Sequence, residues 1–265
     1  MRMLRAEWVK FRSDPGLVAS AAALAVATVA LAALQAGRAE PPVCPAEFPG
    51  CELPPVDRIR LSLSGVFFGQ SLAVVLATLM VADEYATGLV GTTLLACPRR
   101  LAVLAAKAVT VVGVVASAGA VAVAASLSAA AALLPRRGFT AGAGYPLIGA
   151  SDPAVLRAAG GTVLYLCLVA LLAMGVAFAV RDTTATLAVA LSLIYLLPFI
   201  GIASHSQTLA DLIERYAPMP AGLAIQNSVA VEALPIGGWA GQAVLACWAG
   251  CAIIAGWVAF AVRDA

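Results

Sequence analysis

The sequence predicts an all-α integral membrane protein with six transmembrane helices, and its composition and hydropathy are the observations that predict it. Of 265 residues, 62% are apolar and only 11% are charged, whereas an average soluble protein has roughly 25% charged residues. The mean hydropathy is +0.98. Apolar runs of about 20 residues are long enough to cross a hydrocarbon core of roughly 30 Å. Six such runs lie in a single domain, 1–265, at residues 17–36, 61–82, 108–134, 158–180, 183–203 and 239–262.

The first apolar run, 17–36, could be mistaken for a secretory signal. It is longer than the roughly 7 to 15 apolar residues of a signal h-region, and no small-x-small cleavage pattern follows before Pro41. We therefore expect a retained first span.

A basic cluster before this span places the N-terminus in the cytoplasm by the positive-inside rule. Six spans then return the C-terminus to the same side, and loops 37–60, 135–157 and 204–238 face outward. Nine of the sixteen Lys and Arg residues are then cytoplasmic: Arg2, Arg5, Lys10, Arg12, Arg99, Arg100, Lys107, Arg181 and Arg263. Because this excess is slight, the cluster before the first span carries most of the prediction.

The N-terminal segment has the pattern of an amphipathic helix. Leu4, Trp8 and Phe11 recur at i, i+4 and i+7, and the basic residues fall largely elsewhere. Such an interface helix would lie in the headgroup plane with its aromatic face toward anionic lipid. Its predicted members are Leu4, Arg5, Trp8, Lys10, Phe11 and Arg12. A solvated basic start is the alternative.

The first outer loop is rich in proline and contains Cys44 and Cys51. We expect a disulfide between them, because an oxidising outer face permits it. Two free thiols are the alternative. No Cys or His spacing in the chain resembles a metal site.

The last outer loop, 204–238, contains a second amphipathic pattern over 209–216, which Pro218 and Pro220 end. Residues 221–234 are apolar but too short and too polar to span, so a re-entrant or surface helix suits them. The loop is a candidate outer gate, and a packed lid without a gating role is the alternative.

The interiors of the six predicted spans contain no Asp, Glu, Lys, Arg or His. Ion-driven pumps and transporters usually carry such groups as proton relays or ion ligands, so a self-powered carrier or a charge-ringed channel is disfavoured. No G-x-x-x-x-G-K-[ST] phosphate loop occurs. Energy for uphill transport would therefore enter from another polypeptide.

An intramembrane serine protease is a remote alternative. Ser64 and Gly65 supply only half of a G-x-S-G nucleophile motif, and the sole histidine, His205, has no visible orienting group. Both Ser64 and His205 would lie near the outer surface, so geometry alone leaves this pair open.

The polar segment 83–100, between the second and third spans, carries the most specific pattern. Glu84-Tyr85-Ala86-Thr87-Gly88 is followed by a leucine-rich turn, by Pro98-Arg99-Arg100 and by Lys107. This order resembles the coupling helix of membrane subunits of type 2 ATP-binding-cassette (ABC) exporters, E-[FY]-x-x-G-T followed by P-x-R. Leu89 stands where the family usually has Thr. The basic start, the six spans and the Arg181-Asp182-Thr183 turn extend the resemblance over the whole chain.

The resemblance implies a multi-pass permease subunit of a bacterial inner-membrane exporter, with no catalysis and no cofactor of its own. Its partners would be a second permease copy in a homodimer, two ABC ATPase subunits that bind ATP and Mg, and membrane lipid, but no nucleic acid. The ATPase-coupling residues would be Asp83, Glu84, Tyr85, Gly88, Leu95, Pro98, Arg99 and Arg100.

Two physical arguments accompany the predicted coupling segment. Asp83 and Glu84 would place negative charge at the N-terminal end of a cytoplasmic helix, where the dipole favours it. Gly88 would permit close backbone approach. The alternative is a stop-transfer loop whose charges only mark the edge of the bilayer.

The substrate is predicted only as a class. Spans rich in Ala, Val and Leu would suit an amphiphilic or hydrophobic cargo such as a drug, antibiotic, peptide or lipid. Phe67, Phe68 and Gln70 are the candidate pathway residues, although core packing would explain the same side chains. A non-transporting membrane sensor or scaffold that binds another cytoplasmic partner is the competing function.

Overall fold

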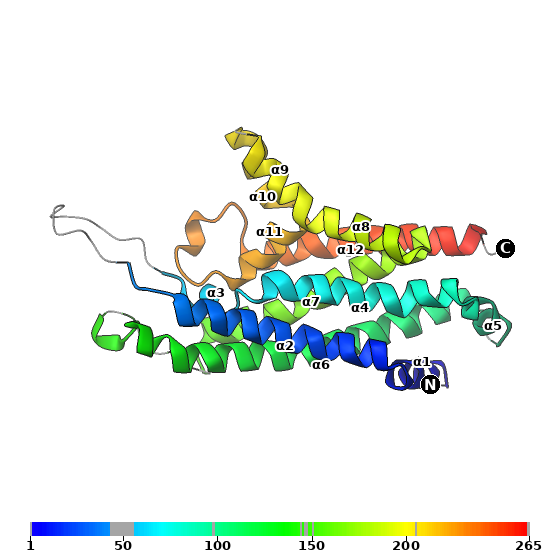
Figure 1. Ribbon diagram of the computed structural model, residues 1–265. Helices are drawn as coiled ribbons and strands as arrows, with labels where there is room; N and C mark the ends of the chain where they lie inside the picture. Colours follow the sequence, from blue (N-terminus) through cyan, green and yellow to red (C-terminus); the bar gives the residue numbers. More distant parts are fainter. Residues whose placement is uncertain are drawn as a thin grey trace.

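The computed structural model of the chain describes residues 2–42, 56–96, 99–143, 145, 148–149, 151–204 and 206–263, whose regular secondary structure is helical without a strand (Figure 1). Cys44 and Cys51, with their predicted disulfide, lie outside these described residues. The longer helices are α1 (Arg2–Ser13), α2 (Pro15–Arg38), α4 (Val66–Ala86), α6 (Arg100–Leu133), α7 (Pro153–Val180) and α12 (Gly238–Arg263). The shorter helices are α3 (Arg58–Ser62), α5 (Leu89–Ala96), α8 (Thr183–Leu191), α9 (Leu197–Ala203), α10 (Gln207–Tyr216) and α11 (Pro218–Leu223). A π turn (η3, Ser192–Leu196) joins α8 to α9, and 3-10 turns lie at Pro135–Arg137 (η1), Ala141–Ala143 (η2), Ala224–Gln226 (η4) and Val231–Ala233 (η5).

The six predicted spans are confirmed as helices long and apolar enough to cross a membrane, as expected of a multi-pass membrane protein. Three of the helices begin several residues away from the predicted starts, and one of them is α7, which begins at Pro153, five residues before the predicted fourth span. The predicted second span, 61–82, began too early, because the chain leaves α3 and breaks at residues 63–65 before α4 begins. The predicted third span, 108–134, began too late, because α6 continues through Lys107 back to Arg100.

Aspartate caps begin three of the spans. Asp14 precedes α2 and accepts hydrogen bonds from the backbone N–H groups of Gly16 and Leu17. Asp152 and Asp182 cap α7 and α8 in the same way, each through one backbone N–H. Proline follows Asp14 and Asp152, where its missing N–H costs no helical hydrogen bond. These local signals explain why the helices begin where they do.

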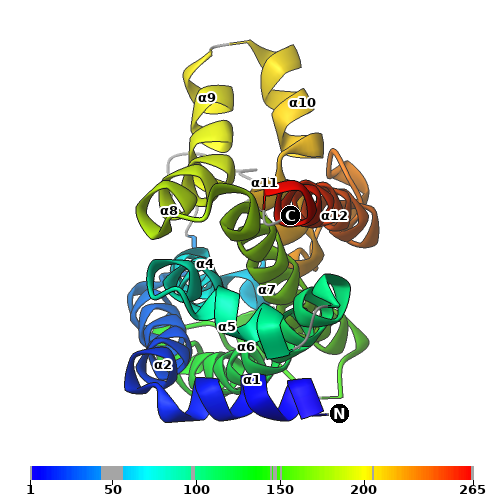
Figure 2. The ribbon, with the colours of Figure 1, turned by 90° about the vertical axis from the view of Figure 1, so that its right-hand side faces the viewer.

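The bundle has a buried centre and an exposed periphery. The most apolar windows of α7 and α4 are 67% and 61% buried, whereas those of α2 and α12 are 17% and 22% buried. Figure 2 views the bundle end-on and shows α1 lying across one end of it. The central helices thus carry the core, and the outer helices present apolar surface to the surroundings.

Glycines bring neighbouring helices close together at two crossings. A Cβ on Gly175 of α7 would lie 2.4 Å from the carbonyl carbon of Ala252 in α12, and one on Gly65 would lie 2.0 Å from the Thr28 carbonyl oxygen of α2. Such distances exclude any larger residue, so backbone contact holds α7 to α12 and α4 to α2.

The fifth span leaves the bundle at an angle. Its π turn ends at Leu196, two residues before Pro198, which has no N–H to continue the helical ladder. Beyond it, α9 and α10 project away from the other helices (Figure 1). The amphipathic helix predicted over 209–216 is confirmed as α10, which has no buried residue, whereas α11 and η4 are largely buried against the bundle.

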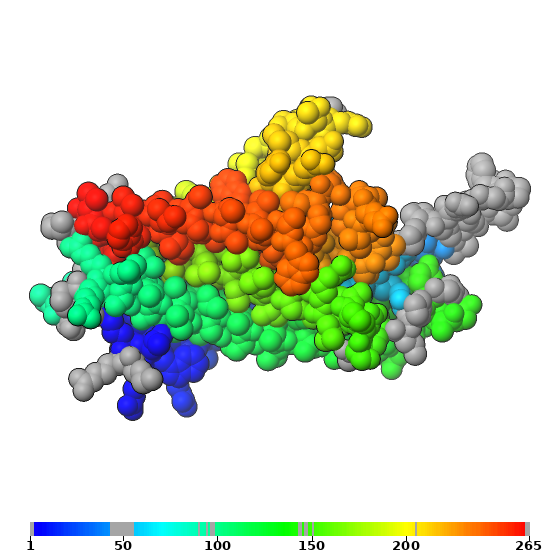
Figure 3. Space-filling view, turned by 180° about the vertical axis from the view of Figure 1, so that it is seen from behind, coloured from blue at the N-terminus to red at the C-terminus, as the bar shows by residue number. Residues whose placement is uncertain are grey.

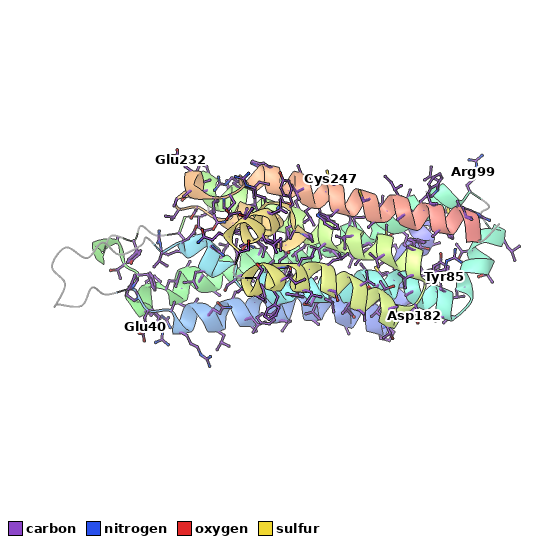
Figure 4. All side chains as sticks on the ribbon, turned by 90° about the horizontal axis from the view of Figure 1, so that it is seen from above. Glu40, Tyr85, Arg99, Asp182, Glu232 and Cys247 are labelled. Carbon is purple, nitrogen blue, oxygen red and sulfur yellow. The ribbon has the colours of Figure 1, made fainter. Side chains whose placement is uncertain are left out.

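The two ends of the bundle differ in what they carry. Both described chain ends lie with α1 and α5 at one end, and Tyr85, Arg99 and Asp182 lie there in Figure 4. Glu40 and Glu232 lie at the other end, with α3. We call these the α5 end and the α3 end.

Candidate functional site

Helix α5 presents apolar side chains at its end of the bundle. Gly88 adopts φ of +72° and reverses the chain between α4 and α5, a conformation that strains residues with a Cβ. On α5 the side chain of Leu95 is 88% exposed and that of Leu89 is 48% exposed. Arg99 is also exposed, just before α6. Exposed leucines on one short helix form a small surface that a partner could cover.

Behind α5 lies an ion cluster of four residues: Glu7, Lys10, Glu84 and Lys107. The Lys107 Nζ atom lies 2.9 Å from Glu7 Oε2 and 2.8 Å from Glu84 Oε1. The Lys10 Nζ atom lies 2.9 Å from Glu7 Oε1 and 3.0 Å from Glu84 Oε1. The cluster therefore joins α1, the end of α4 and the first part of α6, and its formal charges cancel.

The cluster is largely closed to solvent. The side chains of Lys107 and Glu7 are 3% and 5% exposed, and that of Glu84 is 13% exposed. Lys107 also donates to the carbonyl oxygen of Met80 at 2.8 Å, so its three N–H donors have three acceptors. A buried ammonium group is tolerated only with such partners. Pairing thus explains how Lys107 lies inside an apolar helix.

The same contacts shift the titration of the two α1 residues. Burial by itself would raise the pKa of Glu7, but the ammonium groups of Lys107 and Lys10 outweigh it and lower the pKa. Burial would lower the pKa of Lys10, but hydrogen bonds and charge from Glu7 and Glu84 raise it instead. Both groups stay charged around neutral pH.

Two arginines hold the end of α12 against the same region. Arg100 Nη1 donates to the carbonyl oxygens of Phe260 and Ala261 at 3.1 and 2.6 Å, and Arg181 Nη2 donates to that of Ala259 at 3.0 Å. These carbonyls belong to the last turns of α12, where cations are favoured. The Arg181 guanidinium also lies 5.1 Å from the centre of the Tyr85 ring.

The predicted coupling residues therefore divide into two groups. Those at the surface are Asp83, Gly88, Leu95 and Arg99, of which Asp83 also accepts a hydrogen bond from the Thr183 hydroxyl of α8 at 3.4 Å. Those that contact other helices are Glu84 in the ion cluster, Tyr85 against the ring of Phe178, and Arg100 against α12. Pro98 lies outside the described residues.

The helix-dipole explanation for Asp83 and Glu84 was wrong. Both residues lie in the last turn of α4, which ends at Ala86, so their charges lie at a helix C-terminus, where the dipole disfavours them. Lys107 and Lys10 provide the compensating charge for Glu84.

The predicted apolar face of α1 is divided by packing. Phe11 is buried in the main core, whereas Leu4 and Trp8 are 40% and 49% exposed. Arg5 and Arg12 are also exposed. Glu7, one turn before Phe11, points into the bundle instead of toward solvent. The inner face of α1 is thus an acid and an aromatic ring, and its outer face carries Leu4 and Trp8 among arginines.

The three candidate pathway residues do not share one surface. Phe67 and Phe68 are 39% and 49% exposed, whereas Gln70 is fully buried and accepts a hydrogen bond from the Tyr165 hydroxyl. Tyr195 of the π turn joins Phe67: its hydroxyl donates to the Phe67 carbonyl oxygen, and its ring lies 5.3 Å from that of Phe67.

The protease alternative gains no support from this geometry. Ser64 lies in the break before α4, and His205 is outside the described residues. Its neighbours Ser204 and Ser206 lie where α9 meets α10, at the tip that projects from the bundle (Figure 1). Within the described ranges, no group of three or more His, Cys, Asp or Glu residues could hold a metal ion.

A second polar cluster, missed by the sequence reasoning, lies at the α3 end. Asp57 accepts hydrogen bonds from Ser228 Oγ at 2.7 Å, from the Val229 backbone N–H at 3.1 Å and from the Ser228 N–H. Arg60 Nη1 donates to Asn227 Oδ1 at 3.2 Å, and Arg157 Nη2 donates to the Asn227 carbonyl oxygen at 2.8 Å. These contacts tie the loop after η4 to α3 and α7.

Comparison with known proteins adds no family assignment. No protein-family model matches the chain, and no similar sequence was found among curated proteins. The functional reading therefore depends on the motifs and the geometry of the α5 end.

Proposed function

We propose that this chain is the permease subunit of an ATP-driven exporter of the type 2 ABC class, located in a bacterial inner membrane. In this proposal two copies form the transmembrane pathway, and two separate ATPase subunits bind ATP and Mg and dock on α5 from the cytoplasm. The observation that carries the proposal is the pairing of exposed leucines on α5 with the buried ion cluster behind them.

The ion cluster supplies a physical route for force. A partner that holds Leu89, Leu95 and Arg99 would move α5 with the last turn of α4, where Glu84 lies. Glu84 would carry Lys107 on α6 and Lys10 on α1 with it, because separating these buried charges is costly. The three helices would therefore tilt together when the ATPase subunits close.

The proposed pathway lies along the exposed side of α4, away from the bundle core, and along the π turn of the fifth span. Phe67, Phe68 and Tyr195 gather there, with the Ser71 and Tyr195 hydroxyls 2.6 Å apart. Rings with a few hydroxyl groups suit an amphiphilic or hydrophobic cargo. The fifth span is only 22% buried within one chain, which leaves surface for the second copy to cover.

A membrane sensor or scaffold without transport is the second candidate, because the exposed leucines of α5 would serve any cytoplasmic partner equally well. The two functions differ in the partner and in the energy they need. A Walker-type ATPase encoded beside this gene, and ATP-dependent efflux with it, would distinguish them.

The test is co-expression with the neighbouring ATPase, followed by co-purification and efflux from vesicles. We expect Leu95→Glu to abolish both, because the charge would have to be buried in the contact with the ATPase. Leu212→Glu is the matched control, since Leu212 is an exposed leucine on α10, far from α5. If Leu95→Glu retains both co-purification and efflux, α5 is not the docking site. A chain that purifies alone and shows no ATP-dependent efflux would exclude the exporter.

A further inference from the structure

A groove of about 410 Å³ runs between α6 and α7 in the half of the bundle toward the α3 end. Its lining is almost wholly apolar and includes Ala120, Ala124, Ala131, Val155, Ala159 and Gly160. Val123 and Val155 are buried beneath it and pack with Leu63 of the α3–α4 break. The groove is therefore a hollow in the outer surface of the two spans, with a packed floor.

The shape follows from small residues repeated along α6. Ala120, Ala124, Leu127 and Ala131 recur at intervals of three or four and so lie along one stripe of the helix. From Ala120 to Ala131 this stripe is about 16 Å long at 1.5 Å per residue. Among the described lining residues, Ser128 alone bears a hydroxyl group. A long, narrow, apolar hollow matches a linear hydrocarbon chain.

Helices α6 and α7 are both long and apolar enough to cross a membrane, so most of this groove is expected to face hydrocarbon. The surface that α6, α7 and α12 share is seen in Figure 3, and the α9–α10 projection emerges beside α12 along the upper edge of that view. In Figure 2 α6 lies on the side of the bundle opposite α9 and α10. The groove thus faces away from the protruding fifth span.

Two cationic residues lie just beyond the end of the groove. Arg136 and Arg137 form η1, directly after α6, and both are exposed. They follow Ala131 by less than two helical turns and lie just after the end of the predicted span 108–134, so we expect them at the headgroup level. Guanidinium groups bind phosphate oxygens bidentately, and each basic residue near an anionic membrane surface favours binding.

We infer that the α6–α7 groove binds one acyl chain of an anionic phospholipid from the leaflet at the α3 end, with Arg136 and Arg137 at its phosphate. The apolar lining binds the acyl chain, and the two arginines favour a lipid with an anionic headgroup. This site needs neither ATP nor an ATPase, so its test does not depend on the proposed transport function.

The first experiment blocks the groove. An added Cβ on Gly160 meets nothing within 4 Å, so Gly160→Leu would fill the hollow without moving backbone. Gly113 lies on α6, outside the groove and likewise with open space around it, and provides the matched control Gly113→Leu. Ala124→Leu is a second filling variant, in case Gly160→Leu folds poorly. Native mass spectrometry of the delipidated chain with phosphatidylglycerol measures bound lipid.

We expect one phosphatidylglycerol per chain to bind more tightly than phosphatidylcholine. Both filling variants should lose this binding, and Gly113→Leu should retain it. Arg136→Gln with Arg137→Gln should weaken phosphatidylglycerol binding by about 30-fold, about fivefold for each arginine. Arg38 is an exposed arginine in the last turn of α2, at the same end of the bundle. Arg38→Gln should leave phosphatidylglycerol binding unchanged.

Three results would overturn the inference. Equal binding of both lipids, unaffected by the arginine substitutions, would mean that the headgroup is not recognised. Retention of phosphatidylglycerol by both filling variants would place the lipid elsewhere. Loss of dimer in the filling variants, without a change in bound lipid, would assign the groove to a second copy of this chain.

Discussion

The two ends of the bundle both use charged side chains to join separate elements, but in different ways. At the α5 end, Glu7, Lys10, Glu84 and Lys107 pair with one another across three helices. At the α3 end, Asp57 accepts mainly from backbone N–H and hydroxyl groups of one loop. The first arrangement connects helices that can then move together. The second holds a loop in place, so its loss should remain local.

The largest expected effect is at the α5 end. Lys107→Met leaves Glu7 and Glu84 buried with only the partly exposed Lys10, so we expect a loss of about 3–5 kcal/mol in the free energy of unfolding. Urea unfolding in detergent micelles would measure it.

The control for this substitution also removes the two carboxylate charges that Lys107→Met leaves without this partner. Lys107→Met combined with Glu7→Gln and Glu84→Gln should recover much of the loss, because no unpaired buried charge remains. Equal instability of the single and triple variants would show that Lys107 acts through packing alone. The α5 end would then not differ from the α3 end in depending on paired charges.

An intermediate effect is expected at the α3 end. Asp57→Ala removes an acceptor from the backbone N–H groups of Arg60, Ser228 and Val229, and we expect a cost of about 2 kcal/mol. Hydrogen exchange should speed up in residues 227–234 and stay unchanged in α1. Asp57→Asn keeps one acceptor oxygen and should cost less. Faster exchange in α1 as well would mean that the two ends are coupled.

The smallest expected effect is the pH dependence of the ion cluster. The pKa of Glu7 is lowered from about 4.5, so its contribution is complete above that pH and is lost as pH falls through the lowered pKa. The pKa of Lys10 is raised from about 10.5, so its contribution is complete below that pH and is lost as pH rises through the raised pKa. The stabilising window therefore extends from weakly acidic to alkaline pH.

The thermal midpoints of the natural chain and Glu7→Gln test this window. The natural chain should be more stable at neutral pH, and the difference should shrink as pH falls below about 4.5. Glu214→Gln, which changes an exposed acid on α10, should show no such trend. A difference between the natural chain and Glu7→Gln that does not vary with pH would exclude the ionised Glu7 as its source.

Part of the candidate site was readable in the sequence. Glu7 lies three residues after Leu4 and four before Phe11, so an acid on the apolar face of a helix was visible before any fold was known. The predicted third span, 108–134, begins directly after Lys107. Nothing local indicates that Lys107 and Glu7 meet, since 100 residues separate them.

The sequence by itself determined the six apolar helices, the aspartate caps of three of them and the reversal at Gly88, because hydrogen bonds to aspartate, hydropathy and backbone sterics act within a few residues. Only the tertiary structure decided that Glu84 faces inward while Leu95 faces outward, that Gln70 is separated from Phe67 and Phe68, and that α6 and α7 leave a groove between them. Those outcomes depend on which helices approach one another, and buried charges and close glycine contacts select that approach over long separations in the chain.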